Sequence, residues 1–471
     1  MSLERFKIKE RLDEVKSQFE AQKKIIPAQS QALFTMMLQL MELLIVIFEE
    51  RFTRKNTNNS SIPPSKGGKR RKKTRKSSSK KKIEIPDPAD ERDPDEVIDI
   101  YPDYCHNCGL EFEQKSSGYE SRRVLDIVID QYITEYRSHY SDCSCCSYEQ
   151  RGQFPSGVIG PVQYGPMIKA FTIAMLFAQM SSYSRTQVML MELIGRTLSL
   201  ATMVGFVKSL YKKLERWEEW AKSQLLAGAI MHADETGYNL NGQNAWIHVL
   251  SNDNIVLMSA HAKRGKEAID SIGVIPKYGG ILIHDFWQAY YQYEEIKHAA
   301  CGAHLLRELE FIIEAHNHNW ARLMHKVLCD ALEMVNKRKR GKLFEKEYNS
   351  IVRRYRTALG KGQKECPLPK SEGKRGRVAK TKARNLLERF KNHEQEILRF
   401  AIDPVVPFTN NVAERDIRMV KVKQNVSGFF RSVEGALAFC RIRSYLLTQW
   451  RLGIPPIDAL RNAIEGNINY E

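Results

Sequence analysis

Four short β-prone segments in the middle of the chain constrain its fold more than any other feature. Three of them, "AIMHADETGY", "NAWIHVLSN" and "NIVLMSAHA", follow one another directly, separated by turn residues at Asn241, Gly242, Asn252 and Asp253. A short helix is expected from Lys266, and a fourth strand follows in "GILIHDFWQAY". A three-stranded meander, a helix and a further strand predict an α/β core.

Two aspartates lie where strands of this predicted core end. Asp234 falls in "MHADETGY" at the end of the first strand, and Asp285 falls in "ILIHDFWQAY" at the carboxyl end of an apolar strand. Because side chains alternate along a strand, Asp234 and Glu235 should point to opposite faces, so that only one can join a site. A lone aspartate at a strand end is usually a turn former or a helix cap. Two on neighbouring strands favour a ligand site, since such sites gather at the carboxyl ends of strands.

A third carboxylate, Glu414, stands in the basic segment "NNVAERDIRMVK". Asn411 could cap the helix with Glu414 as its partner in a capping box. Glu414 also shares one helical face with Arg418 and Lys421, at spacings of four and seven residues, whereas Asp416 lies about 200° away. A carboxylate with two cations below it suits a metal ion facing a phosphodiester. We therefore interpret Glu414 as both part of a helix start and a metal ligand, with Arg418 and Lys421 as DNA-phosphate contacts.

Three carboxylates that converge on one point repel each other unless cations lie between them. Two divalent ions about 3.5–4 Å apart would neutralise them and hold both the attacking and leaving oxygens of a phosphoryl displacement. Oxygen ligands suit Mg²⁺, with Mn²⁺ as a substitute. Asp234, Asp285 and Glu414 therefore predict metal-assisted phosphoryl transfer rather than glycoside hydrolysis, which needs no basic surroundings.

Clustered cysteines predict a structural zinc site. Two C-x2-C pairs contain Cys105, Cys108, Cys143 and Cys146. Two such pairs offer four thiolates to one tetrahedral Zn²⁺ and leave no position open for chemistry. Cys145 could replace Cys143 or Cys146, and His106 and His139 are further donors. Small buried thiols are the other interpretation, but they fit poorly in so polar a segment.

The charge balance favours a polyanionic partner. Lys and Arg number 73 against 56 Asp and Glu, a formal net charge of +17. Nucleic acid is the commonest partner of such a surplus, and an anionic membrane surface is the second choice. The densest basic run spans 65–82 and includes Lys69, Arg70, Arg71, Lys72 and Lys73. It is expected to be disordered in isolation, and it is either a solvated linker or an arm that grips DNA phosphates.

The remaining segments before the core read as helix. An apolar stripe over 33–47 is either a coiled-coil seam or a face packed on the protein. That stretch is too short and too polar for a spanning helix of roughly 20 residues, and the amino terminus does not resemble a secretory signal. We expect a soluble, cytoplasmic, nucleoid-associated protein. A helix, a turn at Gly195 and a helix start at Ser199 fit either a DNA-binding helix-turn-helix or an ordinary core pair.

These motifs together resemble the DDE transposases of the insertion sequence 66 family. The resemblance is carried by the two C-x2-C pairs, "HADETG", "HDFWQAY", "CGAHLLREL", "NNVAERDIR" and the tail "SYLLTQWRLGIPPIDAL". It implies an RNase H-like catalytic core, whose opening strand order is the one predicted above, with Asp234, Asp285 and Glu414 as the metal-binding triad. It also implies a helical insertion before the glutamate.

The family's C-x2-H spacing carries over to Cys301 and His304. As an isolated pair these two residues cannot complete a zinc site, and they are read either as core packing or as support for the active site. His304 and Arg307 are retained as candidate supporting residues. The resemblance further implies a homo-oligomer on double-stranded DNA, since two transposon ends must be brought together.

The expected organisation divides the chain into seven regions. They are an N-terminal helical or coiled-coil region (1–56), a basic linker (57–100), a zinc-binding module (101–152), a helical region that could hold a helix-turn-helix (160–228), the RNase H-like core (229–300 and 400–435), the helical insertion (301–399) and a C-terminal helical element (436–471). The predicted function is divalent-metal-dependent cleavage of transposon ends and 3′-OH strand transfer. The alternatives are a transposase-derived DNA-binding protein without catalysis, and a nuclease or resolvase on the same core.

Overall fold

The computed structural model describes most of the chain after residue 92. It covers residues 93–470 except 102, 106, 112–117, 125–130, 339–340, 369–379 and 429, together with Ser17 and Ala21. The described chain divides into two compact units, one of 165–182 and 203–470 and the other of 93–164 and 183–202. The predicted N-terminal helix and basic run, including Lys69, Arg70, Arg71, Lys72 and Lys73, lie outside the described residues.

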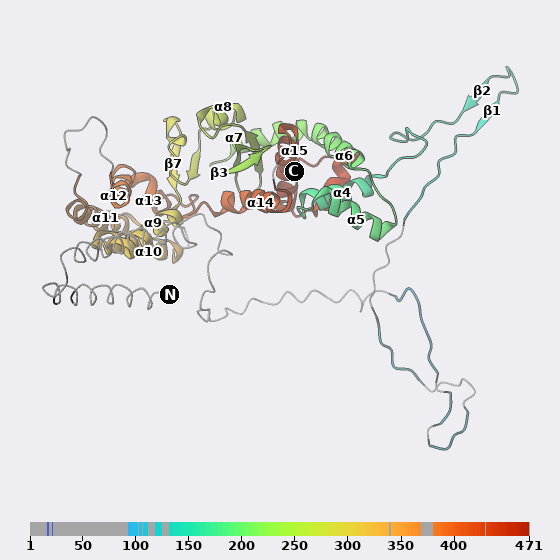
Figure 1. The fold of residues 1–471 in the computed structure, drawn as a ribbon, viewed down its shortest axis with the longest axis horizontal. Coiled ribbons are helices and arrows are strands. Elements are labelled where there is room, and N and C mark those ends of the chain that lie inside the picture. Colours follow the sequence, from blue (N-terminus) through green and yellow to red (C-terminus); the bar gives the residue numbers. More distant parts are fainter. Residues whose placement is uncertain are drawn as a thin grey trace. The chain divides into compact units, whose positions relative to one another are not determined.

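A five-stranded mixed sheet forms the centre of the first unit (Figure 1). In spatial order its strands are β5 (Val256–His261), β4 (Gln243–Ser251), β3 (Ile230–Leu240), β6 (Ile281–His284) and β7 (Lys297–Ala300). The first three pair antiparallel, whereas β6 is parallel to β3 and β7 is parallel to β6. The predicted meander followed by a further strand is confirmed.

The turn between β3 and β4 follows from its sequence. Asn241 and Gly242 have φ values of 46° and 88°. A two-residue hairpin with both φ angles positive matches the twist of the flanking strands, and Asn and Gly tolerate that conformation best. This turn sets the register in which Leu240 pairs with Gln243.

The connection from β5 to β6 contains the predicted short helix, α8 (Lys266–Ile272), which ends at Gly273 with a φ of 76°. A 3₁₀ turn, η2 (Ile275–Lys277), follows it, and another, η3 (Tyr290–Gln292), lies between β6 and β7. All four residues of β6 are buried. Its first three residues are apolar and the fourth is His284, and such buried, mainly apolar runs are typical of parallel strands covered on both faces.

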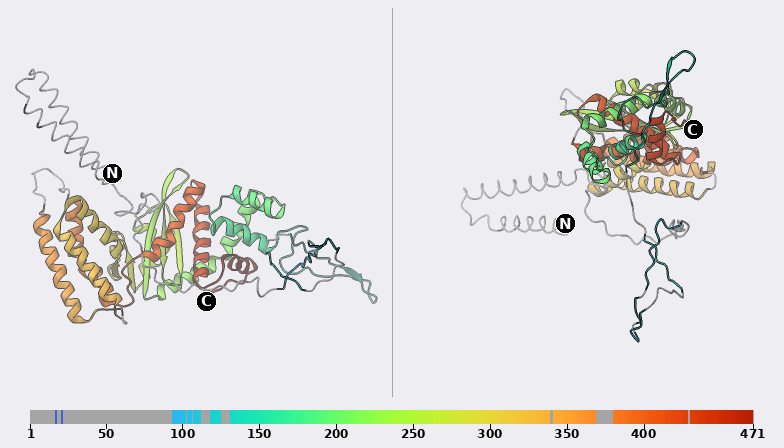
Figure 2. Two further views of the ribbon diagram at one scale, coloured as in Figure 1. Left: turned by 90° about the horizontal axis from the view of Figure 1, so that it is seen from below. Right: turned by 90° about the vertical axis from the view of Figure 1, so that its right-hand side faces the viewer.

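Helix α15 (Val433–Arg451) protects the edge strand β5. The backbone N–H of Met258 donates to Ser444 Oγ at 2.7 Å, and the N–H of Val256 donates to Thr448 Oγ1 at 3.0 Å. Ser444 and Thr448 are one helical turn apart, and Val256 and Met258 are two strand residues apart. The spacing of the two hydroxyls along α15 therefore matches the spacing of the two N–H groups along β5. Figure 2 shows α15 lying alongside the strands. An edge covered in this way cannot pair with another chain.

Further helices complete this unit. They are α4 (Pro166–Phe177), α7 (Glu215–Ala227), α14 (Asn411–Ser427) and α16 (Pro456–Glu465). Helix α14 packs against β3 and β4, α7 contacts β5, and α16 packs on α4. Helix α14, which contains Glu414, therefore lies across β4 and β3, and β3 contains Asp234.

The predicted helical insertion between β7 and α14 is helical throughout its described part. It consists of α9 (Gly302–His316), α10 (Asn319–Asn336), α11 (Glu345–Glu365), α12 (Lys382–Asn392) and α13 (Glu394–Ile402). Its core includes the fully buried Trp320, Tyr355 and Phe390. Gly362 of α11 lies so close to the Trp320 ring and Leu387 that a Cβ there would collide with Leu387. This core continues into the sheet, because Ile283 of β6 and Ala299 of β7 belong to the same cluster of buried residues.

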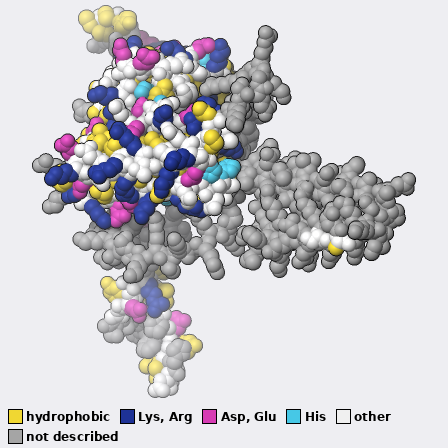
Figure 3. Space-filling view, turned by 90° about the vertical axis from the view of Figure 1, so that its left-hand side faces the viewer, with side chains coloured by type: hydrophobic (Ala, Val, Ile, Leu, Met, Phe, Trp, Pro, Cys, Tyr) yellow, Lys and Arg dark blue, Asp and Glu magenta, His cyan; other side chains and the backbone are white. Residues whose placement is uncertain are grey.

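Exposed basic side chains are frequent on the insertion. Figure 3 views this end of the unit and shows many Lys and Arg side chains. Those without an acidic partner among the described residues include Lys326, Lys346, Arg353, Lys361, Lys364 and Lys391.

The second unit contains a short hairpin, β1 (Tyr140–Asp142) with β2 (Glu149–Arg151), and helix α5 (Tyr183–Ile194). The turn after α5 has Gly195 at a φ of 61°. Ser199 Oγ then accepts the N–H of Thr202 at 3.0 Å, as an N-cap does, where α6 (Leu200–Lys213) begins. The predicted helix, turn and second helix are confirmed as elements, and their role in DNA binding stays a prediction.

Within the described chain, no helix is both long enough and apolar enough to cross a bilayer.

Candidate functional sites

The two aspartates predicted as metal ligands lie at the same level of the sheet. β3 and β6 pair as far as His232 opposite Ile283, and Asp234 and Asp285 each lie two residues beyond that pair. The prediction that Asp234 ends its strand is wrong, because pairing with β4 continues β3 to Leu240. What ends next to Asp234 is the parallel pairing with β6, and the two carboxylates lie where these strands separate.

The backbone after β6 is strained where it presents Asp285. Phe286 is buried and has a φ of 72°, which is unusual for a bulky residue. The N–H of Trp287 donates to Asp285 Oδ1 at 3.2 Å. Strained residues of this kind persist only where the surroundings hold them, and they cluster at functional sites. The turn therefore gives Asp285 a defined orientation.

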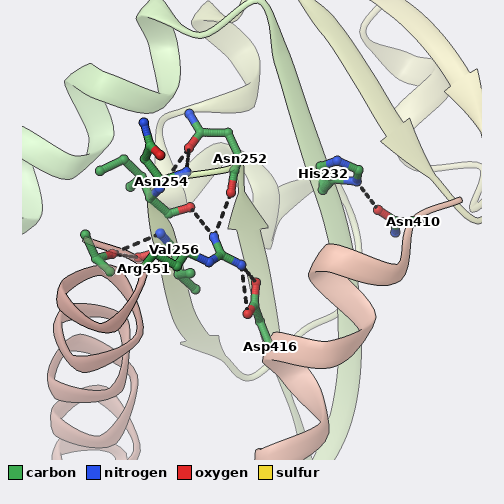
Figure 4. A network of polar contacts seen from close by, with 9 residues as sticks. His232, Asn252, Asn254, Val256, Asn410, Asp416 and Arg451 are labelled. Carbon is green, nitrogen blue, oxygen red and sulfur yellow. Dashed lines mark hydrogen bonds and ion pairs between the residues drawn. The ribbon is translucent and has the colours of Figure 1, made fainter. Parts of the chain in front are cut away.

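Asn410 joins the start of α14 to β3, as Figure 4 shows for its contact with His232. Its Oδ1 lies 2.8 Å from His232 Nδ1, its Nδ2 donates to the carbonyl of Ala233 at 2.8 Å, and the side chain is fully buried. The predicted cap at Asn411 is wrong by one residue. Asn410 occupies the N-cap position, and its side chain makes no cap bond because it binds β3 instead. Nothing in the sequence indicated this role, since asparagines before a helix ordinarily indicate a cap.

Glu414 lies in the first turn of α14 and faces the start of α9. Its Oε1 is 3.4 Å from His304 Nδ1 and 3.7 Å from Cys301 Sγ, and its Oε2 is 4.0 Å from an Arg307 nitrogen. The candidate supporting residues His304 and Arg307 therefore both lie beside Glu414. In the described part of the chain, Cys301, His304 and Glu414 are the one trio of possible ligands whose atoms all lie within 4.8 Å of one another. Asp234, Asp285 and Glu414 do not form so tight a group.

The acidic side chains nevertheless act on one another. Burial raises the pKa of Asp234 well above its usual range, and the negative charges of Glu235, Asp285 and Glu414 raise it further. The N–H of Glu235, 2.9 Å from Asp234 Oδ1, opposes this shift only in part. No ion pair among the described residues includes Asp234. A cation bound between these oxygens would relieve the repulsion, and carboxylate oxygens are the ligands that Mg²⁺ and Mn²⁺ prefer, so the residues fit such an ion.

Glu235, next to Asp234, is fully engaged by protein partners. Its side chain is 1% exposed and pairs with Arg264, whose Nε is 3.1 Å away, while the Tyr290 hydroxyl donates at 2.8 Å. Burial and the charge of Asp285 raise the pKa of Glu235, and the bonds from Arg264 and Tyr290 lower it. These partners occupy both carboxylate oxygens of Glu235 and leave Asp234 as the less satisfied of the two.

Arg264 is held between two aromatic rings. Its guanidinium carbon lies 4.7 Å from the centre of the Trp246 ring and 4.5 Å from that of the Trp287 ring. Cation–π contacts of this kind restrict a long side chain to one position. Because Trp287 follows Asp285 by two residues, the stack links the Glu235 pair to the turn that presents Asp285. Nothing in the sequence near Arg264 indicated this role.

The other charged residues of α14 have separate environments. Arg418 is exposed and has no acidic partner among the described residues. The Lys421 ammonium donates to the carbonyl of Gly237 and lies 3.3 Å from Gln424 Oε1. Asp416, on the face expected to point away from Glu414, is buried, and Nη2 of Arg451 donates to its Oδ1 at 2.9 Å and to its Oδ2 at 2.7 Å (Figure 4).

Each C-x2-C pair lies in a small hairpin of the same geometry. The N–H of Cys105 donates to Leu110 and the N–H of Cys143 donates to Tyr148, each to the carbonyl five residues later. In both hairpins the fourth residue after the first cysteine donates back to it and has a positive φ, 76° at Gly109 and 52° at Ser147.

The electrostatics of the hairpins are also alike. Backbone N–H groups of Asn107 and Cys108 lower the pKa of Cys105, and those of Cys145 and Cys146 lower the pKa of Cys143. Cys145 thus occupies the position of Asn107 rather than that of a paired cysteine. The structure does not bring the four sulfurs of the two hairpins into one tight group.

Comparisons with known proteins identify the family. Two solved structures similar to part of the chain are of the HTLV-2 integrase catalytic core domain in complex with magnesium. The dimeric form is 17% identical over 27% of this chain and 83% of that chain, and the trimeric form is 16% identical over 31% and 88%. Both have a TM-score of 0.14, which is too low for a shared fold to follow.

No curated protein matches the sequence. A sequence profile described as "Transposase IS66 family" matches residues 161–438, more than half of the chain. The chain therefore belongs to the IS66 family of transposases.

Proposed function

We propose that this transposase cleaves the DNA at transposon ends by divalent-metal-dependent phosphoryl transfer and then joins the freed 3′-OH to target DNA. One observation carries the proposal. Asp234 and Asp285 lie at the same level of two adjacent parallel strands, and α14, tied to β3 through Asn410, brings Glu414 near enough for its charge to act on Asp234. An RNase H-like core is the fold that this strand order supports.

Asp234, Asp285 and Glu414 would hold Mg²⁺ or Mn²⁺. Two bound ions supply an activated nucleophile and stabilise the charge that develops on the oxygens of the phosphodiester. Burial raises the pKa of Asp234 most, and the nearby negative charges add to it; both effects support this assignment, because a bound cation would oppose them. Glu235 is left out of the proposed ligand set, since Arg264 and Tyr290 already satisfy it.

Positioning falls to residues that surround the carboxylates. Asn410 fixes the start of α14 against His232 and Ala233. Glu414, in the first turn of α14, is thereby held in a fixed position relative to β3. Lys421 anchors the next turns of α14 to the carbonyl of Gly237. Arg418, exposed one turn from Glu414, is the proposed contact with a DNA phosphate, and His304 and Arg307 support Glu414.

Double-stranded DNA is the proposed substrate, bound by a homo-oligomer. Support comes from the net charge of +17 and from the exposed cations of the insertion that have no acidic partner among the described residues. Phosphate contacts of this kind position DNA without reading its sequence. The basic run that includes Lys69, Arg70, Arg71, Lys72 and Lys73 is proposed to add to them.

A structural Zn²⁺ is proposed for Cys105, Cys108, Cys143 and Cys146. The matching hairpins support this set, because each offers two sulfurs in the same local geometry, with N–H groups that favour the thiolate. The same match supports Cys143 and Cys146 over Cys145 as ligands.

The test is cleavage of a duplex carrying the element's own ends in the presence of Mg²⁺. Glu414→Gln should lower the cleavage rate by more than about 100-fold, beyond the effect typical of outer-shell partners, while end binding and folding persist. Glu434→Gln, at an exposed position in the first turn of α15, is the matched control and should cleave normally. Undiminished cleavage by Glu414→Gln would remove Glu414 from the active site. If the wild-type protein binds ends but never cuts them, a DNA-binding function without catalysis is the better description.

A further inference from the structure

Glu414 belongs to a second constellation besides the three carboxylates. Cys301 directly precedes α9, His304 lies in the first turn of α9, and Glu414 lies in the first turn of α14. Their ligand atoms all lie within 4.8 Å of one another. The sequence offered Cys301 and His304 only as a pair, which cannot complete a zinc site. The fold adds the third ligand from more than a hundred residues away.

The donor atoms of this trio are poorly used by the protein itself. His304 Nδ1 is buried and has no hydrogen-bond partner in the described chain. It comes within 3.4 Å of Glu414 Oε1, but without the geometry of a hydrogen bond. The Cys301–Glu414 contact, at 3.7 Å, is long as well. Buried polar atoms left unsatisfied in this way are uncommon, and binding an ion is one way in which a protein satisfies them.

The surroundings hold the trio in place. Cys301 Sγ accepts the backbone N–H of Asn410 at 3.2 Å, which is the outer-shell bond that a ligating thiolate favours. The N–H of Gly302 donates to the carbonyl of Phe408 at 2.8 Å, and a Cβ on Gly302 would collide with the Phe408 ring. The start of α9 is therefore locked against the segment that leads into α14.

The donor set selects the kind of metal. One thiolate, one imidazole and one carboxylate suit a borderline-soft divalent ion, whereas Mg²⁺ prefers oxygen ligands alone. Three protein ligands with a fourth position left for water is a common arrangement for Zn²⁺. We propose that Cys301, His304 and Glu414 form a Zn²⁺ site, and that Zn²⁺ bound there withdraws Glu414 from Asp234 and Asp285.

Such a site would make Zn²⁺ an inhibitor of the Mg²⁺-dependent reaction. Glu414 cannot serve both sites at once, and in this structure it lies with Cys301 and His304 rather than in a tight group with the two aspartates. The binding of Zn²⁺ stands by itself, whereas its inhibitory effect rests on the proposed function.

Zinc stoichiometry of the full-length protein tests the site directly. Zn²⁺ is titrated against a chromophoric chelator in the wild type, in His304→Gln and in His325→Gln. His325 is the matched control, because its side chain is 29% exposed against 28% for His304, and Cys329 Sγ lies 3.7 Å from its Nδ1. We expect His304→Gln to bind one equivalent fewer than the wild type and His325→Gln to bind the same number. Equal stoichiometry in all three would overturn the proposal.

The difference between variants does not depend on whether the C-x2-C hairpins bind zinc. A second readout is the thiolate-to-metal absorption of bound Co²⁺, which should weaken in Cys301→Ser. Because Cys301 is fully buried, the Co²⁺ spectrum of Cys301→Ser is interpreted only if this variant still unfolds in a cooperative transition. If it does not, the zinc stoichiometry of His304→Gln alone tests the site.

Cleavage assays then test the consequence. Each protein is compared with its own cleavage rate without Zn²⁺. Because His304 is a direct ligand in the proposed site, the Zn²⁺ concentration that halves this rate should rise in His304→Gln by at least the roughly 10–100-fold typical of outer-shell partners. If the wild type never cleaves but the stoichiometry differs as expected, the proposed function fails and the zinc site stands. If the wild type cleaves DNA in Mg²⁺ and all three proteins bind the same number of Zn²⁺ ions, the proposed function stands and only the zinc site is excluded.

Discussion

Helix α14 carries two acidic residues on opposite faces, and their surroundings differ. Asp416 is 5% exposed and both of its oxygens bind Arg451, which also donates to the carbonyls of Asn252 and Ile255. Glu414, two residues earlier, has only contacts of 3.4 Å or longer to side chains. One carboxylate is satisfied by the fold, and the other is left for a ligand.

The same contrast recurs on β3. Glu235 is enclosed by Arg264 and Tyr290, whereas its neighbour Asp234 has no ion pair among the described residues. In both places a satisfied carboxylate lies next to an unsatisfied one. In this fold, the candidate ligands Asp234 and Glu414 are therefore the carboxylates that the protein leaves without strong partners.

Asp416→Asn should have the largest effect, because it removes one partner of a buried ion pair. Breaking a buried ion pair typically costs about 3–5 kcal/mol, because the remaining charge is left uncompensated. Arg451 keeps its two carbonyl partners, so we expect the free energy of unfolding to fall by about 3 kcal/mol, measured by urea denaturation. Asp458→Asn, in the exposed pair with Arg461, should change stability by less than about 0.5 kcal/mol. If Asp416→Asn changed the free energy of unfolding as little as Asp458→Asn, the Asp416–Arg451 pair would have no role in stability.

Asp234→Asn should raise the free energy of unfolding, whereas Asp416→Asn should lower it. The raised pKa means that the folded protein binds a proton more tightly than the unfolded chain does. The free energy of unfolding therefore falls as pH rises from the ordinary aspartate pKa, about 4, towards the raised value.

Without divalent ions, Asp234→Asn removes this loss and should be more stable than the wild type at neutral pH. The gain is about 1.4 kcal/mol for each unit by which the pKa is raised. Urea titrations between pH 4 and 7 measure it, and added Mg²⁺ should narrow the difference. A variant less stable than the wild type at every pH would contradict the raised pKa of Asp234 that burial and the neighbouring carboxylates produce.

The smallest effect concerns the two basic residues that share the Glu414 face. Arg418→Ala should reduce the slope of log affinity against log salt by about 0.9, the loss of one phosphate contact. Lys421→Ala should change the slope less, because the Lys421 ammonium already binds the carbonyl of Gly237. Fluorescence anisotropy with labelled duplex over a range of salt concentrations measures both. A larger change for Lys421 would reverse their assignment.

Local patterns predicted much of this molecule. The strand meander, the turn at Asn241 and Gly242, the helix start at Ser199 and the helical insertion all depend on contacts between residues close in sequence, and all are present. The placement of Asp416 away from Glu414 followed from helical geometry alone. The end of β3 could not be predicted from the local sequence, because pairing with β4 sets the length of this strand rather than the residues around Asp234.

The family, the order of the elements and the identity of the candidate ligands follow from the sequence, because each is encoded in a short stretch of chain. Which of the candidate ligands contact one another depends on the folded arrangement. Asn410 reaches β3 instead of capping its helix, Arg264 neutralises Glu235, and Glu414 turns towards Cys301 and His304. These contacts join residues tens to hundreds of positions apart, and their partners are chosen by the packing of α9 and α14 against the sheet rather than by any local pattern.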